Sequence, residues 1–172
     1  MQKLSVAEVN SLDTPEFVQR FGGVFEASPW VAESAWDRRP FRDQTALHAA
    51  MCACVQDAGE ERQLALIRAH PDLVGQAARE GTLGAASASE QAGAGLDQLG
   101  PEDVRWFERY NRAYREKFDF PFIICVRAAE RKRAIMDGFE LRLHHTPAQE
   151  RTAALVEIEK IAGFRLADLV EG

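Results

Sequence analysis

Apolar residues recur at every third or fourth position through much of the chain, which is the spacing of helices with one buried face. The pattern is clearest over residues 102–118, where charged residues fill most of the positions between the apolar ones. It predicts further helices over residues 129–143 and 147–162, with Gly163 ending the second of these. The apolar positions of the 102–118 helix are Val104, Phe107, Tyr110, Tyr114 and Phe118.

Polar residues that can accept backbone N–H groups mark the expected helix starts. Two helices, over residues 45–58 and 60–69, are separated by Gly59 and lead into His70 and Pro71. The expected N-caps are Ser5, with Glu8 three residues later, and Thr14, Ser28 and Thr146, each followed by a proline.

Residues 120–126, FPFIICV, are the one stretch that reads as a buried strand, and a single strand has no neighbour to satisfy its backbone groups. We therefore expect an all-α fold, a single-domain bundle of about eight or more helices with residues 1–172 as one domain. Residues 75–95 carry five glycines and the weakest pattern, and we expect a mobile loop over a site there.

Composition narrows the class of protein. The 172 residues are 46% hydrophobic, enough for one sizeable core, and the net charge of −6 disfavours a nucleic-acid partner. No apolar run reaches the roughly 18 residues of a membrane span, and the N-terminal residues lack the apolar centre of a secretory signal. We expect a cytoplasmic protein without membrane contact, whose three cysteines, Cys52, Cys54 and Cys125, are reduced and mostly buried.

His70 is the first candidate for chemistry. A histidine at the end of a helix, followed by the rigid Pro71, titrates near neutral pH and can transfer a proton. The alternative is a structural one, in which His70 only places a partial positive charge at the C-terminus of the helix. For an isolated His-Pro pair this alternative is the more common case.

Two other segments carry polar groups that a helical bundle does not require. Ser87 and Glu90 have the spacing of a capping box, and spacing alone favours that structural role, although a helix start is also an anion site and Glu90 could orient an imidazole. The backbone of residues 120–124 needs partners, which can be a small polar ligand or simply packing contacts. No metal site is expected, because the pair His144 and His145 has no carboxylate or cysteine neighbours at metal-ligand spacing, His48 lies on an Ala-rich helix, and no HExxH or CxxC motif exists.

Five segments gain weight from their order and spacing over nearly the whole chain. They are FGGVFEASPWVAE at residues 21–33, AHPDL at 69–73, SASEQAGAGLDQL at 87–99, YNRAYREKFDFPFIICV at 110–126 and EIEKIAGFRLADLV at 157–170. Together they closely resemble the 2-oxo-4-hydroxy-4-carboxy-5-ureidoimidazoline (OHCU) decarboxylase family of urate breakdown. The chain departs from the family at residues 81–86, GTLGAA, where relatives often carry a more polar loop.

The resemblance implies an all-helical homodimer that uses no cofactor and converts the small-molecule substrate OHCU to (S)-allantoin and CO2. It implies that His70 is the catalytic histidine, that Glu90 is its acidic companion and that Arg165 completes the pocket. The substrate contacts it implies are Pro71, Ser87, Gln91 and the backbone of Phe122, Ile123, Ile124, Cys125 and Val126.

Two other classes of function are compatible with the helical pattern. A non-enzymatic helical adaptor would use the same amphipathic helices but would not need His70, Glu90 and Arg165 to converge. A small hydrolase of the same purine pathway would open a ring with activated water and release no CO2.

Overall fold

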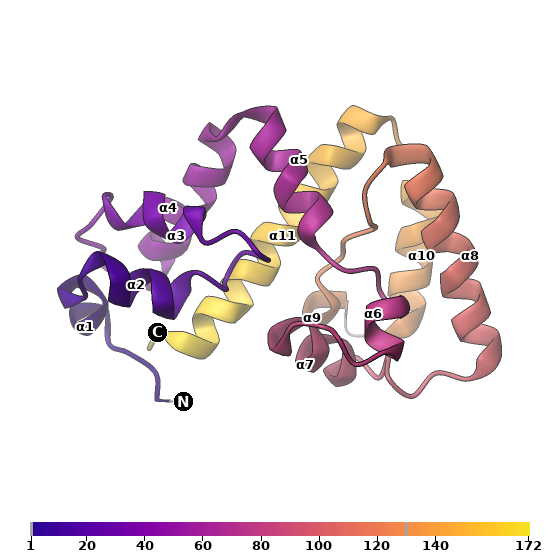
Figure 1. Ribbon diagram of the computed structural model, residues 1–172, viewed down its shortest axis with the longest axis horizontal. Coiled ribbons are helices and arrows are strands. Elements are labelled where there is room, and N and C mark those ends of the chain that lie inside the picture. Colours follow the sequence, from indigo (N-terminus) through magenta and orange to yellow (C-terminus); the bar gives the residue numbers. More distant parts are fainter. Residues whose placement is uncertain (1, 130) are drawn as a thin grey trace. The chain divides into compact units, whose positions relative to one another are not determined.

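The computed structural model describes residues 2–129 and 131–172, and these residues contain eleven α-helices (Figure 1). The helices are α1 (Val6–Ser11), α2 (Thr14–Phe21), α3 (Trp30–Trp36), α4 (Gln44–Asp57), α5 (Gly59–Ala69), α6 (Gln76–Arg79), α7 (Ala85–Gly93), α8 (Pro101–Phe118), α9 (Val126–Ala129), α10 (Lys132–Arg142) and α11 (Pro147–Leu169).

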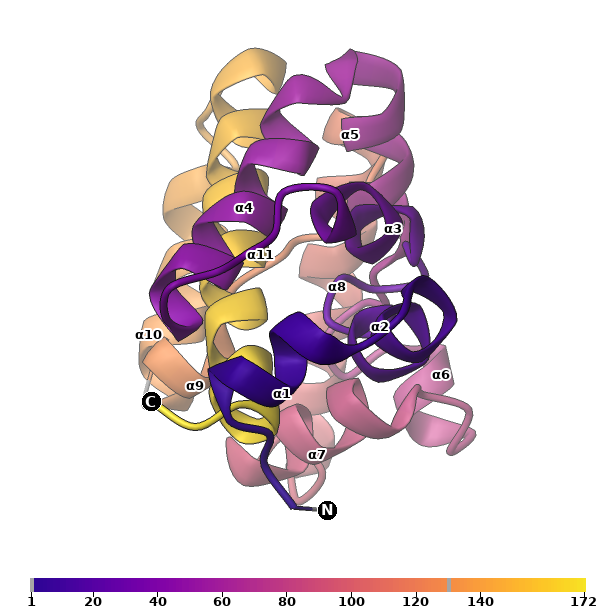
Figure 2. The same cartoon turned by 90° about the vertical axis from the view of Figure 1, so that its left-hand side faces the viewer.

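The all-α class predicted from the sequence is confirmed, and no strand occurs among the described residues. The one β-type contact in the described part of the chain is an isolated parallel bridge between Leu4 and Val170. Leu4 donates its N–H to the Leu169 carbonyl at 2.9 Å and accepts the N–H of Glu171 at 2.8 Å, so the two terminal segments lie side by side (Figures 1 and 2).

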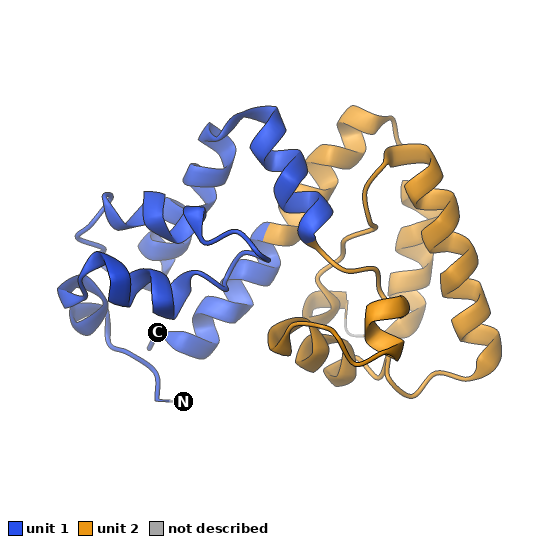
Figure 3. Ribbon diagram, in the orientation of Figure 1, with its two compact units in different colours: residues 1–69, 159–172 blue, residues 70–158 orange. Residues whose placement is uncertain are grey.

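The chain divides into two compact units (Figure 3). The first contains the residues up to 69 together with residues 159–172, and the second contains residues 70–158. The helix α11 is continuous and contributes residues to both. The assignment of residues 1–172 to one domain stays a prediction.

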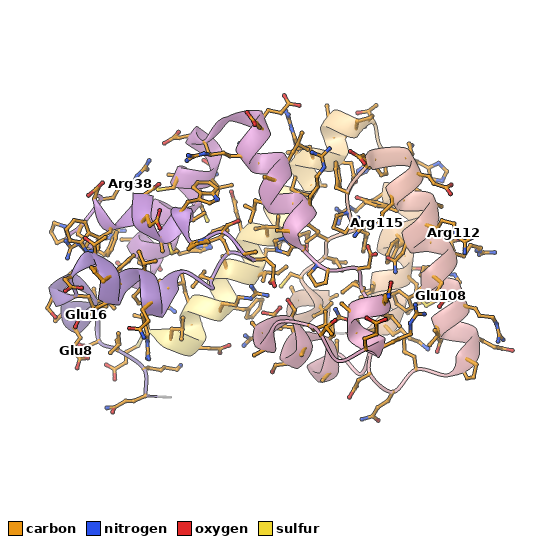
Figure 4. All side chains as sticks on the ribbon, in the orientation of Figure 1. Glu8, Glu16, Arg38, Glu108, Arg112 and Arg115 are labelled. Carbon is orange, nitrogen blue, oxygen red and sulfur yellow. The ribbon has the colours of Figure 1, made fainter. Side chains whose placement is uncertain are left out.

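In the first unit, α1 and α2 begin at reciprocal capping boxes, whose acidic members Glu8 and Glu16 are labelled in Figure 4. Ser5 caps α1 as expected. The expected cap Thr14 is wrong: Asp13 accepts the Glu16 N–H at 2.9 Å, and Thr14 is already the first helical residue. A carboxylate one residue earlier fits the cap geometry and leaves Pro15 in the first turn, where no N–H is needed.

Two further expected helix starts have opposite outcomes. Ser28 is not a cap, because α3 begins at Trp30 after Pro29 and has no side-chain cap. The start at Thr146 is confirmed, since its N–H donates to the Gln149 side chain at 2.9 Å and its hydroxyl accepts the Gln149 N–H at 3.3 Å.

An aromatic cluster forms the core of the second unit and joins α8 to α10. Phe107 and Tyr114 of α8 meet Phe139 of α10 edge to face, with ring centroids 6.0 Å and 6.1 Å away. The ring of Phe122 stacks on Phe139 at 3.7 Å. These four side chains are at most 1% exposed, so they anchor the non-helical residues after α8 against two helices.

Two stretches differ from the expected elements. Residues 75–95, expected as a loop, contain the short helices α6 and α7. The helix expected over residues 129–143 is found as α10, which begins three residues later, at Lys132, and the short helix α9, which ends at Ala129, precedes it.

The last helix continues through Gly163, where the sequence predicted its end. Gly163 has an ordinary helical environment, and a Cβ there would lie 3.5 Å from the ring of His48 on α4. Beyond it, Leu166 is fully buried, so packing continues along the helix. Tertiary burial therefore outweighs the local preference of glycine for a helix end.

Replacing Gly163 with Ala should raise the free energy of unfolding by about 0.5–1 kcal/mol, because alanine loses less backbone entropy in a helix and its Cβ makes only an ordinary contact with His48. Urea denaturation measures the change. The matched control is Gly59→Ala, which should destabilise the protein because Gly59 has a φ of +79°. A loss of stability in Gly163→Ala would contradict the ordinary helical environment that the structure gives this residue.

Candidate active site

His70 follows the last residue of α5 directly and is 6% exposed. The predicted position at the end of a helix is therefore confirmed. A histidine that only places a positive charge at a helix C-terminus is normally exposed to water, so the burial of His70 is not explained by that role. The half-buried Pro71 follows it and restricts the backbone at this point.

Three side chains from α7 and α8 hold the residues that follow His70. Arg115 of α8 binds both carboxylate oxygens of Asp72 through its Nε at 3.0 Å. Asn111, one turn earlier on α8, donates its Nδ2 to the Leu73 carbonyl at 2.8 Å. The side-chain oxygen of Gln91 on α7 accepts the Val74 N–H at 3.0 Å. In Figure 4, Arg115 is labelled with Glu108 and Arg112 along the same helix.

These bonds stabilise a backbone that is unfavourable by itself. Val74 has a φ of +53°, a left-handed conformation that β-branched residues rarely adopt. The next residue must be small, because a Cβ on Gly75 would lie 2.7 Å from the Asp72 Cβ. The sharp turn after His70 is thus fixed by specific side chains.

The helix α7 carries three of the predicted site residues. It begins at Ala85, and Gly84 is its N-cap without a side-chain bond, so the capping box that spacing favours for Ser87 and Glu90 is wrong. Both residues lie inside the helix. Ser87 and Gln91 are four residues apart, share one face and are each 6% exposed, while Glu90 is half-buried. Burial of Ser87 and Gln91 needs an explanation other than helix initiation.

The non-helical residues after Phe120 are buried except Ile124, which is half-buried, and side chains bind two of their backbone groups. The Ile123 carbonyl accepts Nη1 of Arg142 on α10 at 2.6 Å, and the Cys125 N–H donates to Glu157 of α11 at 2.7 Å. Val126 then begins α9. The strand-like stretch therefore has no strand partner among the described residues, and two charged side chains take that role.

Arg165 lies inside α11 and belongs to the first unit, whereas all other predicted site residues belong to the second. Its Nη2 is 3.0 Å from a carboxylate oxygen of Glu26, and its Nη1 donates to the Gly23 and Val24 carbonyls at 3.4 Å and 3.3 Å. Arg165 is 6% exposed and Glu26 is half-buried, so the guanidinium group of this ion pair is largely shielded from water. Its convergence with His70 stays a prediction.

Several residues that organise this site were missed by the sequence analysis. Asn111 had a readable signal, because it is a polar residue on the apolar stripe between Phe107 and Tyr114 of α8. Arg142 and Glu157 had none, because their partners are backbone groups 19 and 32 residues away.

The remaining candidates have structural partners. The His48 Nε2 lies 2.8 Å from the Glu159 carbonyl, and the His145 Nδ1 lies 2.9 Å from a carboxylate oxygen of Glu150. Within residues 2–129 and 131–172, no group of three or more His, Cys, Asp or Glu side chains could hold a metal ion. The helices in the same residues are all too short or too polar to cross a membrane.

All three cysteines are buried free thiols, as predicted. Burial raises the pKa of the Cys125 thiol, and the charges of Glu157 and Glu90 act in the same direction. Burial also raises the pKa of Cys52, to about 12. A raised pKa keeps a thiol neutral near physiological pH, so neither cysteine is poised as a nucleophile.

Iodoacetamide at about pH 8 should therefore leave Cys125 unmodified in the folded protein, because alkylation requires the thiolate and that form appears only as the pH approaches the raised pKa. Peptide mass spectrometry after timed alkylation measures this, with the urea-denatured protein as the positive control. Rapid labelling of Cys125 in the folded protein at that pH would contradict its burial and its raised pKa.

Comparison with known proteins identifies the family. Residues 10–167 match the family model described as OHCU decarboxylase. The chain is 43% identical to the 2-oxo-4-hydroxy-4-carboxy-5-ureidoimidazoline decarboxylase of Haloferax volcanii, over 98% of this chain and 97% of that protein. It is 38% identical to the human protein named putative 2-oxo-4-hydroxy-4-carboxy-5-ureidoimidazoline decarboxylase, over 97% of this chain and 96% of that one.

Solved structures agree with this match. A crystal structure of (S)-allantoin synthase aligns with a TM-score of 0.79 at 30% identity, and it covers 98% of this chain, which spans 54% of that one. A crystal structure of OHCU decarboxylase in the presence of (S)-allantoin, 18% identical, shares the fold with a TM-score of 0.64 over 84% of this chain and 93% of that one. With its sequence matched over nearly its full length, the chain belongs to the OHCU decarboxylase family.

Proposed function

We propose that this protein decarboxylates OHCU to (S)-allantoin and CO2 in urate breakdown, without a metal or an organic cofactor. The observation that carries the proposal is the hydrogen bond from Val74 to Gln91, which ties the turn after His70 to the helix that carries Ser87 and Glu90. The names of the full-length relatives support the same reaction.

The chemistry explains why so few residues suffice. The carbon that loses CO2 lies beside a ring C=N bond, so the electron pair of the breaking C–C bond forms a C=C bond while the C=N pair moves to nitrogen, which is protonated. The hydroxyl on the first carbon then loses its proton as C=O forms, and a proton is added to the neighbouring carbon. The protein must supply position, exclusion of water and proton transfer.

We assign the proton transfers to His70, oriented by Glu90. Gln91 uses its side-chain oxygen on Val74, so its amide nitrogen is the group that would donate to the substrate. Pro71 and Ser87 would contact the substrate, and so would the backbone of Phe122, Ile123, Ile124, Cys125 and Val126. Within this stretch the Ile123 carbonyl and the Cys125 N–H already bind Arg142 and Glu157, and Ile124 between them is the half-buried residue, so its backbone groups are the candidates we favour for contact with the substrate.

The proposal includes three properties beyond the reaction. Arg165 would bind the carboxylate or ureido oxygens of the substrate through its guanidinium group. The protein would act as a homodimer and would reside in the cytoplasm.

The decisive experiment generates the unstable substrate from urate in situ and follows CO2 release and the enantiomers of allantoin. We expect faster CO2 release than in the enzyme-free reaction and an excess of (S)-allantoin. A hydrolase would release no CO2, and an adaptor would leave the spontaneous rate and the racemic product unchanged.

Replacing His70 with Asn should abolish the enzymatic rate while the protein stays folded, because asparagine keeps hydrogen bonding but cannot exchange a proton near neutral pH. Circular dichroism confirms folding, and the coupled assay measures turnover. A folded His70→Asn protein with near-native activity would remove His70 from the mechanism.

Replacing Arg165 with Lys should raise the barrier by about 1.5–3 kcal/mol, or roughly one to two powers of ten in kcat/KM, because lysine keeps the charge but loses the two-pronged geometry. Looser binding should also increase the racemic fraction of the product. Arg38→Lys is the control, since Arg38, labelled in Figure 4, pairs with Asp57 at the surface. Unchanged kcat/KM and enantiomeric excess in Arg165→Lys would give Arg165 a structural role, such as its contacts with Glu26 and the Gly23 and Val24 carbonyls.

A further inference from the structure

Arg142 connects a buried carboxylate to the backbone of the predicted substrate segment. Its Nη1 donates to the Ile123 carbonyl at 2.6 Å, and its Nε donates to Glu150 at 2.8 Å. Its Nη2 donates to the same Glu150 oxygen. Arg142 is 8% exposed and Glu150 is 0% exposed, so water contributes little to holding this guanidinium group in place.

Glu150 is held in turn by two further groups. Tyr114 donates its hydroxyl to the oxygen that Arg142 binds, and the His145 Nδ1 lies 2.9 Å from the other oxygen. Burial raises the pKa of Tyr114, and its hydrogen bond to Glu150 acts in the same direction, so the hydroxyl stays protonated and remains a donor. Both carboxylate oxygens are thus occupied, and Arg142 has one fixed orientation.

The same guanidinium group also fixes the side chain before Ile123. The Arg142 Cζ lies 4.5 Å from the centre of the Phe122 ring, and that ring stacks on Phe139. Arg142 therefore holds two consecutive residues, one by its ring and one by its carbonyl.

A second carboxylate holds the other end of the segment. Glu157 of α11 accepts the Cys125 N–H at 2.7 Å. The Phe122 and Ile124 side chains both lie 3.4 Å from the place that a Cβ on Gly138 would occupy, so both are directed toward α10. Two hydrogen bonds to charged side chains, from Arg142 to the Ile123 carbonyl and from the Cys125 N–H to Glu157, thus flank Ile124. We call each of these bonds a grip on the backbone.

We propose that Arg142, supported by Glu150, and Glu157 are positioning residues for the decarboxylation, because they set the direction of the Ile124 backbone toward the substrate. The inference rests on the proposed function. Stability alone seldom explains a buried ion pair, since replacing it with apolar side chains of similar volume often leaves a protein equally stable. Apolar side chains could not orient the Ile123 carbonyl and the Cys125 N–H, because they form no hydrogen bonds.

The test compares variants that keep or remove each grip. In Glu157→Gln the amide oxygen still accepts the Cys125 N–H, whereas Glu157→Ala removes the acceptor. Arg142→Lys keeps the charge but cannot reach both the Ile123 carbonyl and Glu150 with fixed geometry. Arg133→Lys is the control, because Arg133 also lies on α10 but pairs with Asp137 at the surface.

We expect kcat to fall about tenfold or more in Glu157→Ala and Arg142→Lys, with a smaller change in KM and a larger racemic fraction of allantoin. Glu157→Gln should recover most of the kcat and the enantiomeric excess, and Arg133→Lys should behave as the wild type. A folded Glu157→Ala protein with unchanged kcat and enantiomeric excess would overturn the role of Glu157. The same result in Arg142→Lys would overturn that of Arg142.

A measurement without substrate separates this inference from the proposed function. Amide hydrogen exchange at Ile124 and Cys125 should be faster in Glu157→Ala than in Glu157→Gln. If Arg142→Lys does not fold, the comparison of Glu157→Ala with Glu157→Gln still decides whether the hydrogen bond to the Cys125 N–H contributes to kcat. If the wild type has no decarboxylase activity, the proposed function fails and the positioning role fails with it, while the exchange rates still report whether the grip on the backbone exists.

Discussion

The non-helical and largely buried backbone of residues 120–125 is the constraint on which the second unit depends. Within a helix, all but the terminal N–H and C=O groups bind one another, but a non-helical segment packed in the core has no such internal partners. Here Arg142 and Glu157 supply the missing partners, and each must be neutralised or bound in turn. Glu150 is buried for this reason, and the aromatic residues around Phe139 give the segment an apolar floor.

The helix α8 supports both predicted parts of the site at once. Asn111 and Arg115 hold the turn after His70, while Tyr114 between them donates to Glu150 on the network that reaches Ile123. One rigid helix therefore fixes the histidine segment and the backbone segment in the same frame. Rigid elements that support a site are a general requirement for geometric precision in catalysis.

The helical class and most helix positions could be predicted from the sequence, because periodicity and capping are local. The failures have a common physical origin. Gly163 was expected to end a helix that burial of Leu166 extends, and Ser87 with Glu90 was expected to begin a helix that begins at Ala85. His70 and Gln91 were predicted through family resemblance. The side chains that bind the backbone of Ile123 and Cys125 could not be predicted. No local pattern in the sequence relates an arginine, for example, to a carbonyl 19 residues away.

The bonds that shape the site join residues far apart in the chain: Val74 to Gln91 spans 17 residues, Leu73 to Asn111 spans 38 and Asp72 to Arg115 spans 43. The backbone hydrogen bonds within each helix join residues only four apart. On mild denaturation the long-range bonds should therefore break while much of the helical content persists, so inactivation would precede the loss of the far-ultraviolet helical signal. The turn at Val74, which has a left-handed backbone, would be among the first parts to change conformation once its hydrogen bond to Gln91 breaks.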